Sequence, residues 1–128
     1  MTHEQLKVAG SSHLFAIGAH TLTHPYLSQK SEDVQRREIF ESKEILSKLT
    51  GKPVRYFAYP GGDYNRDTLK LVKEAGYEAA FSVIPDQLGI DHLFEIGRVG
   101  IYTPSLFKLF LKVIGIADLA RRLNLRVG

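Results

Sequence analysis

The stretch FAIGAHTLTHPYLSQ, residues 15–29, joins an apolar run to two histidines that lie four positions apart. The run LFAIGAH, residues 14–20, has the length and composition of a short buried strand that ends at His20. His24 follows in a loop, and Pro25 stiffens the chain directly after it. The spacing alone leaves two interpretations open: a pair of metal ligands, or two polar residues of a loop.

Other features of this stretch favour the metal interpretation. A histidine that ends an apolar strand is expected to point into the floor of a cleft. Thr21 and Thr23 offer short hydroxyls that could orient the imidazoles. Neutral imidazole is a good ligand for divalent transition metals such as zinc.

Strands alternate with helices along the rest of the chain, which predicts an α/β fold with a parallel sheet. Three helices are expected to begin at Thr2, Ser31 and Asn65, each a residue type that caps helices. In the second helix, the apolar side chains that fall roughly on one face are Val34, Ile39, Ile45, Leu46 and Leu49. The remaining predicted strands are 54–60, 78–84 and 95–101, and the remaining predicted helices are 105–115 and 117–125.

Composition limits the classes of function. The chain has 128 residues and a mass of 14.4 kDa, which fits one domain spanning 1–128. Cysteine is absent, so thiolate chemistry and disulfides are excluded. We expect no membrane span and no signal peptide in this chain, because no apolar run reaches about 18 residues and the first ten are polar. The net charge of +3 is spread along the chain, and we expect no nucleic-acid partner.

A second polar cluster, FAYPGGDYN at 57–65, follows the next predicted strand. One interpretation is a plain turn, in which Pro60, Gly61 and Gly62 only reverse the chain. The other is that these glycines leave backbone N–H groups bare, where they could stabilise an oxyanion. The carboxyl ends of parallel strands meet at one edge of a sheet, so this turn and His20 should lie near each other.

The motifs resemble those of the polysaccharide deacetylases of the NodB-homology type, carbohydrate esterase family 4. IGAHTLTHPYLSQ, at 17–29, resembles the family's second motif, and RYFAYPGGDYN, at 55–65, is similar to its third. AGYEAAFSV and EIGRVGI, at 75–83 and 95–101, resemble the segments that usually follow. The resemblance implies a distorted (β/α) barrel and removal of N- or O-acetyl groups from a polysaccharide or oligosaccharide with a divalent metal, often zinc.

The resemblance also implies roles for individual residues. His20 and His24 would be metal ligands. Gly61 would donate its N–H to the oxyanion beside Pro60, and Tyr59 and Tyr64 would border the sugar.

The sequence departs from the family at several positions. The family's first motif carries an Asp-Asp pair that supplies the general base and a third metal ligand, and no Asp-Asp pair occurs in this chain. We therefore expect an incomplete (β/α) barrel, truncated at its N-terminal side. Many members carry Arg where Ala58 stands. Arg98 could supply that charge, or it could form a salt bridge at the rim.

Further candidate ligands and acids are weaker. His92 is a poor match for the family's general acid, and Asp63 and Asp91 are better explained as capping residues.

Three classes of function remain open: part of a metal-dependent deacetylase, a non-catalytic relative that binds carbohydrate or metal, and a basic binding module. For the third, the nearest basic cluster is Arg121, Arg122 and Arg126, which a solvated helix face also explains. Family members often act in the cell envelope or outside the cell, and the sequence itself indicates no compartment. Because an incomplete barrel leaves sheet edges open, we expect a homo-oligomer.

Overall fold

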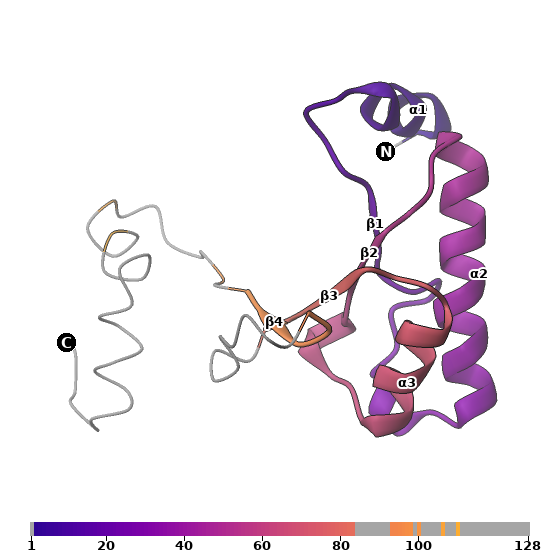
Figure 1. Ribbon diagram of the computed structural model, residues 1–128, viewed down its shortest axis with the longest axis vertical. Helices are drawn as coiled ribbons and strands as arrows, with labels where there is room; N and C mark the ends of the chain where they lie inside the picture. Colours follow the sequence, from indigo (N-terminus) through magenta and orange to yellow (C-terminus); the bar gives the residue numbers. More distant parts are fainter. Residues whose placement is uncertain (1, 84–92, 99, 101–105, 107–109, 111–128) are drawn as a thin grey trace.

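Four parallel strands make one sheet in the part of the chain that the computed structural model describes, residues 2–83, 93–98, 100, 106 and 110. The strands lie in the order β1-β2-β3-β4, which is also their order along the chain (Figure 1). Their bounds are Gly18–Ala19, Tyr56–Ala58, Ala79–Ser82 and Ile96–Gly97. The predicted α/β fold with a parallel sheet is therefore confirmed.

The strands are shorter than the sequence predicted. Residues 14–20 were expected to be extended and buried, yet only Gly18 and Ala19 pair with a neighbour, in register with Tyr56 and Phe57. Leu14 and Phe15 are 75% and 65% exposed. Among the described residues β1 has a partner strand on one side only, so the residues before it have no second strand to pair with.

Three helices are described: α1 (His3–Ser11), α2 (Glu32–Thr50) and α3 (Arg66–Glu74). The predicted caps Thr2 and Asn65 both form complete capping boxes. Ser31 does precede α2, but its side chain makes no capping hydrogen bond. Two short 3₁₀ turns, η1 (Leu27–Gln29) and η2 (Pro60–Gly62), follow β1 and β2 respectively.

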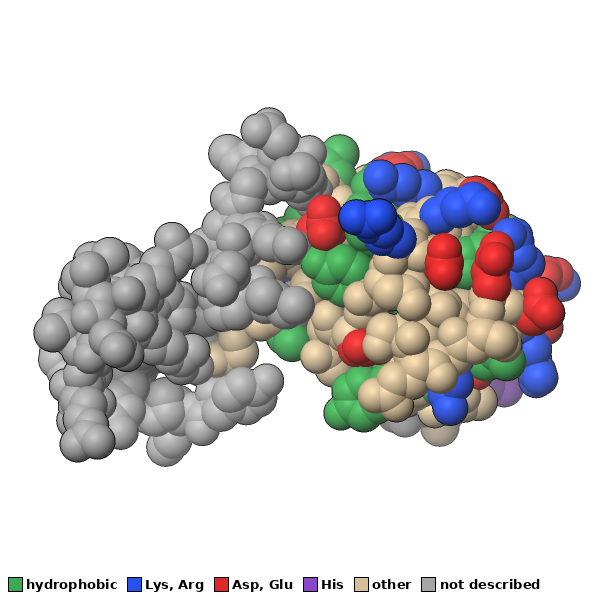
Figure 2. Space-filling model, turned by 90° about the horizontal axis from the view of Figure 1, so that it is seen from below, with side chains coloured by type: hydrophobic (Ala, Val, Ile, Leu, Met, Phe, Trp, Pro, Cys, Tyr) green, Lys and Arg blue, Asp and Glu red, His purple; other side chains and the backbone are tan. Residues whose placement is uncertain are grey.

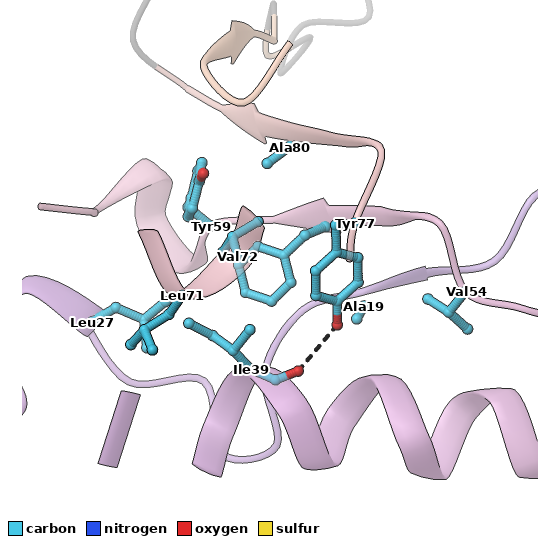
Figure 3. Packing of buried hydrophobic residues seen from close by; sticks show 10 residues of the cluster. Ala19, Leu27, Ile39, Val54, Tyr59, Leu71, Val72, Tyr77 and Ala80 are labelled. Carbon is cyan, nitrogen blue, oxygen red and sulfur yellow. Dashed lines mark hydrogen bonds between the residues drawn. The ribbon is translucent and has the colours of Figure 1, made fainter. Parts of the chain in front are cut away.

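The core lies between the sheet and the pair of helices α2 and α3, which flank the strands on one side (Figure 1). Each of β1, β2 and β3 contributes one residue to this core, namely Ala19, Phe57 and Ala80. Figure 3 shows these layers meeting, with the Tyr77 hydroxyl donating to the Ile39 carbonyl of α2 at 3.1 Å. Burial raises the pKa of Tyr77 to about 12, so this phenol stays a neutral donor at ordinary pH.

The buried face of α2 matches the predicted one only in part: Ile39 is buried and Leu46 packs against the core, as predicted. Val34 and Ile45 are exposed, whereas the buried residues of the helix are Gln35, Glu38, Ile39 and Ser42. Three of these four side chains are polar, and each has a hydrogen-bond partner. This face of α2 therefore packs on loops that need hydrogen bonds, and its pattern is not set by hydrophobicity alone.

The surface of the helical layer carries charges of both signs. In Figure 2, Lys and Arg side chains alternate with Asp and Glu on the face seen from below. Several are paired along or between helices, as in Arg36–Glu74 at 3.1 Å. No helix within the described residues is long and apolar enough to cross a membrane. The helices predicted at 105–115 and 117–125, including the arginines near residue 121, lie outside the described residues apart from Leu106 and Phe110.

Candidate active site

His20 directly follows β1, and its ring is anchored to the neighbouring strand. The Nδ1 atom lies 2.7 Å from the carbonyl oxygen of Ala58, at the end of β2. A carbonyl can only accept, so Nδ1 carries the proton in this bond. The lone pair of the neutral ring is then on Nε2, which is the form of imidazole that binds a metal.

The loop from His20 to His24 is a tight turn with unusual backbone angles. Thr21 and His24 have φ of 62° and 59°, in the left-handed region that non-glycine residues rarely adopt. Each such residue costs about 1–3 kcal/mol, and the surrounding structure must offset that cost. The turn brings the two rings together, with centroids 4.8 Å apart and planes at 72°. Both histidines are exposed at this end of the sheet.

The threonines act differently from the prediction. Neither hydroxyl contacts an imidazole. Thr21 Oγ1 donates to the His20 carbonyl at 2.6 Å and accepts the His24 N–H at 3.1 Å. Thr23 Oγ1 donates to Glu38 at 2.6 Å. Both threonines therefore hold the loop backbone, and the ring of His20 is oriented by the Ala58 carbonyl instead.

Glu38 is the residue that the sequence interpretation missed. It lies on the buried face of α2, is 6% exposed, and accepts hydrogen bonds from the middle of the loop. Burial alone would raise the pKa of this carboxyl, but the bonds from Thr23 and Leu22, together with nearby Arg37, outweigh it and hold the pKa below its usual value. The sequence did hold a signal for this burial: Glu38 shares one helix face with the polar residues Gln35 and Ser42.

The turn after β2 requires left-handed backbone angles at two positions, and glycine occupies both. Gly61 and Gly62 have φ of 61° and 72°. The Gly62 and Asp63 N–H groups close the turn onto the carbonyls of Tyr59 and Pro60. Gly61 is exposed, and its N–H has no acceptor within the described residues. The turn interpretation and the oxyanion interpretation are thus compatible in this geometry.

Two contacts join the histidine loop to this turn. The Tyr26 ring lies over Gly61 so closely that a Cβ there would meet Tyr26 Cε1 at 2.6 Å. The Asp63 carboxylate accepts the Ser28 N–H at 2.7 Å and the Ser28 hydroxyl at 2.6 Å. The Asp63 side chain therefore links η1 to the residue that follows η2.

The expectation that Tyr59 borders a sugar is wrong in this structure. Its side chain is fully buried, 0% exposed, and its hydroxyl donates to the Phe94 carbonyl at 2.8 Å. Burial raises the pKa of Tyr59, with Tyr64 and Glu95 adding to the rise, so it stays a neutral core residue. The Pro60 side chain is also buried, so it could not contact a sugar directly. Tyr64 is half-buried and stacks on Tyr59 with centroids 4.7 Å apart.

Arg98 shares a hollow with His20. The hollow has a volume of about 380 Å³ on the sheet face away from α2 and α3, and Ala58 and Phe81 also line it. Arg98 follows β4, and its Nε donates to the Ser82 carbonyl at 3.4 Å. Among the described residues it forms no ion pair, so the rim salt bridge is not seen there. Asp91 and His92 lie outside the described residues.

The donor set fits part of a metal site. Two neighbouring imidazoles, one with its Nδ1 proton fixed, are suited to a divalent transition metal. The described residues contain no group of three or more His, Cys, Asp or Glu that could hold a metal ion. Since zinc sites use three or four ligands, any further ligand would come from residues beyond those described or from solvent.

Comparison with known proteins places these motifs in a family. The family model for polysaccharide deacetylase matches residues 2–80, which include both histidines and the glycine turn. The chain belongs to the polysaccharide deacetylase family. A peptidoglycan-N-acetylglucosamine deacetylase of Bacillus cereus is 32% identical over 71 residues, which are 56% of this chain and 25% of that protein.

Solved deacetylase structures share the fold. The Streptococcus pyogenes deacetylase PplD, solved in complex with acetate, superposes with a TM-score of 0.74 at 28% identity, covering 88% of this chain and 50% of that one. BA3943, a CE4 family pseudoenzyme from Bacillus anthracis, matches with a TM-score of 0.57 at 22% identity, over 61% of this chain and 27% of that one. The chain thus spans between a quarter and a half of these relatives, and its sheet corresponds to part of their (β/α) barrel.

Proposed function

We propose that this chain is part of the catalytic domain of a metal-dependent polysaccharide deacetylase, which removes acetyl groups from an amino-sugar polymer. One observation carries the proposal: His20 and His24 lie together at the end of β1, with the Nδ1 proton of His20 directed to Ala58. The similarity to a peptidoglycan-N-acetylglucosamine deacetylase supports the substrate class.

His20 and His24 would hold the metal, with zinc the first candidate. The chemistry that such a metal would supply is polarisation of an acyl carbonyl and acidification of a water molecule. The Gly61 N–H, which is exposed and has no acceptor among the described residues, would donate to the oxygen that gains negative charge. Arg98 would add positive charge to the same hollow as His20.

The proton acceptor for the attacking water has no candidate in the described site. Asp63 is engaged by Ser28, and Glu38 is engaged by Leu22 and Thr23. The chain contains no Asp-Asp pair, which is the base-bearing motif that the family resemblance implies. The base would therefore be an acidic residue outside the described part of this chain, in another segment of a longer protein, or in another chain.

A non-catalytic relative that binds carbohydrate or metal is the second candidate. The missing Asp-Asp pair is the observation that favours it, since general-base catalysis contributes on the order of a hundredfold or more to rate. In that case the histidine pair would bind metal without turnover.

Acetate release distinguishes the two candidates. The assay uses acetylated chito-oligomers and peptidoglycan fragments, with the polypeptide encoded by the whole reading frame that contains this segment. A deacetylase releases acetate, and both chelation and His20→Ala abolish the release. No acetate from any of these substrates, with the metal bound, would favour the non-catalytic relative.

The 128-residue chain alone gives a second result from the same assay. We expect it to release almost no acetate, because the base is absent. Turnover of about 1 per second or faster by this chain would show that another of its residues serves as the base.

A further inference from the structure

Glu38 directs its carboxylate into the middle of the loop that separates the two histidines. Its Oε2 accepts the N–H groups of Leu22 at 2.7 Å and Thr23 at 2.9 Å, and its Oε1 accepts the Thr23 hydroxyl at 2.6 Å. The side chain is 6% exposed and projects from the long helix α2. Hydrogen bonds to an ionised carboxylate are stronger than those between neutral groups, and the helix α2 holds this carboxylate in place.

The two histidines are anchored unequally. His20 is held by its own ring, through the Ala58 carbonyl of β2. The ring of His24 has no such hydrogen bond among the described residues; only its N–H is held, by Thr21 within the same loop. Both Thr21 and His24 have left-handed backbone angles, which a free loop would tend to relax.

We infer that Glu38 is a positioning residue, which fixes the loop backbone and thereby sets where the His24 ring lies relative to His20. Glu38 touches neither imidazole, so it acts through Leu22 and Thr23. Its predicted effect on metal affinity rests on the proposed function, whereas its effect on the loop does not.

The carboxylate could also act on a bound cation through its charge alone, and two substitutions separate these effects. Glu38→Ala removes all three acceptors. In Glu38→Gln the remaining oxygen can still accept the two N–H groups, and the Thr23 hydroxyl can turn to accept from the new amide. Glu38→Gln therefore keeps the geometry and loses the charge.

Zinc titration of the purified chain measures the metal affinity of each variant. We expect Glu38→Ala to weaken affinity at least about tenfold, the usual size for groups that orient ligands indirectly, and Glu38→Gln to weaken it much less. Ser42→Ala is the control: Ser42 is buried one turn along α2, and its hydroxyl donates to the Ile39 carbonyl rather than to the histidine loop. It should stay within about twofold of wild type. Wild-type affinity in Glu38→Ala, or equal losses in Glu38→Ala and Glu38→Gln, would overturn the positioning role.

Amide hydrogen exchange of the metal-free chain gives the second readout. The His24 N–H bonds to Thr21 and not to Glu38, so it reports whether the loop as a whole is held. We expect faster exchange at His24 in Glu38→Ala and no change in Ser42→Ala. Unchanged exchange at His24 in Glu38→Ala would contradict the inference.

The two readouts can fail separately. If the wild-type chain binds no zinc, the proposed metal site fails, and exchange at His24 alone decides the role of Glu38. If Glu38→Ala does not fold, Thr23→Val replaces it, because this variant removes one of the three bonds to Glu38 and should shift both readouts in the same direction.

Discussion

Each of the two turns that form the candidate site contains two described residues with left-handed backbone angles. Thr21 and His24 follow β1, and Gly61 and Gly62 follow β2. The first pair is strained because its residues carry side chains, and the second pair is relaxed because glycine adopts these angles freely. The strain is thus concentrated where the histidines are presented, while the turn that offers the Gly61 N–H is free of it.

The two glycines should differ sharply in their tolerance of a methyl group. Alanine at Gly61 would place its Cβ 2.6 Å from the far edge of the Tyr26 ring, which is exposed and can move. At Gly62 the Cβ would lie 2.3 Å from Val83 Cγ2 and 2.7 Å from the Val83 backbone nitrogen. A backbone atom cannot move aside as an exposed ring can. We expect Gly61→Ala to lower the free energy of unfolding by about 1–2 kcal/mol and Gly62→Ala by about 3 kcal/mol or more.

Urea denaturation of both variants beside wild type measures this difference. Gly51→Ala serves as the control, since Gly51 has φ of 67° but no atom within 4 Å of a Cβ. Its loss should therefore be similar to that of Gly61→Ala. Equal losses for Gly61→Ala and Gly62→Ala would contradict the packing described for η2.

The sequence identified the residues of the site better than their contacts. The pair His20 and His24 and the glycine turn were recognisable from motif and position, since both follow apolar runs. The burial of Tyr59 was not predictable, because an aromatic residue beside a turn suits a cleft wall and a core equally well. Its direction depends on strand alternation, and β2 proved to be three residues long.

At the scale of elements, the link between α2 and the histidine loop matters most. The sequence predicted α2 and its bounds well, because Ser31 and Gly51 mark its two ends. It predicted Ile39 on the buried face but missed Gln35, Glu38 and Ser42. These three are buried with their hydrogen bonds made, and an apolar-periodicity argument does not detect them. The short β1 was overestimated for a related reason: its apolar run lacks a neighbouring strand on one side among the described residues.

The carboxylate of Glu38 should make stability depend on pH in a defined direction. Its pKa in the folded chain lies below the usual 4.5, so its charged form favours folding. The stability that it contributes is fully present above the unfolded pKa and is lost as pH falls through the lower, folded pKa. The difference in unfolding free energy between wild type and Glu38→Gln should therefore be largest near neutral pH and shrink below about pH 4.

Denaturation at a series of pH values from about 7 to 3 measures that difference. Ser42→Ala supplies the comparison, because a hydroxyl does not titrate and its stability loss should not change with pH. A wild-type-to-Gln difference that stays constant over the whole range would show that Glu38 is not ionised differently in the folded and unfolded chain.

At the scale of the whole molecule, the described residues cover one face of the sheet with helices and leave the other face without such a layer. Helices α2 and α3 cover the first (Figure 1). The second carries half-buried Tyr56 and Phe81, whose rings meet edge to face at 6.3 Å. Leu14 and Phe15 are exposed just before the edge strand β1. Apolar side chains beside an open strand edge favour association with another chain.

The 128-residue chain should therefore form dimers or larger oligomers in solution, burying more than about 1,000 Å² in total. Light scattering at micromolar concentrations should give a mass above 14.4 kDa that rises with concentration. Leu14→Ser combined with Phe15→Ser should shift the equilibrium toward monomer if this edge is the contact. A mass of 14.4 kDa that does not depend on concentration would rule out the oligomer.

Zinc binding by the two histidines tests the account most directly. Calorimetric titration compares the wild-type chain with the His20→Ala/His24→Ala double variant, with His13→Ala as a matched control, because His13 is exposed and lies outside the loop. The account predicts that wild type and His13→Ala bind one zinc ion per chain, more weakly than a complete site would, and that the double variant loses this binding. Equal zinc binding by wild type and the double variant would contradict it.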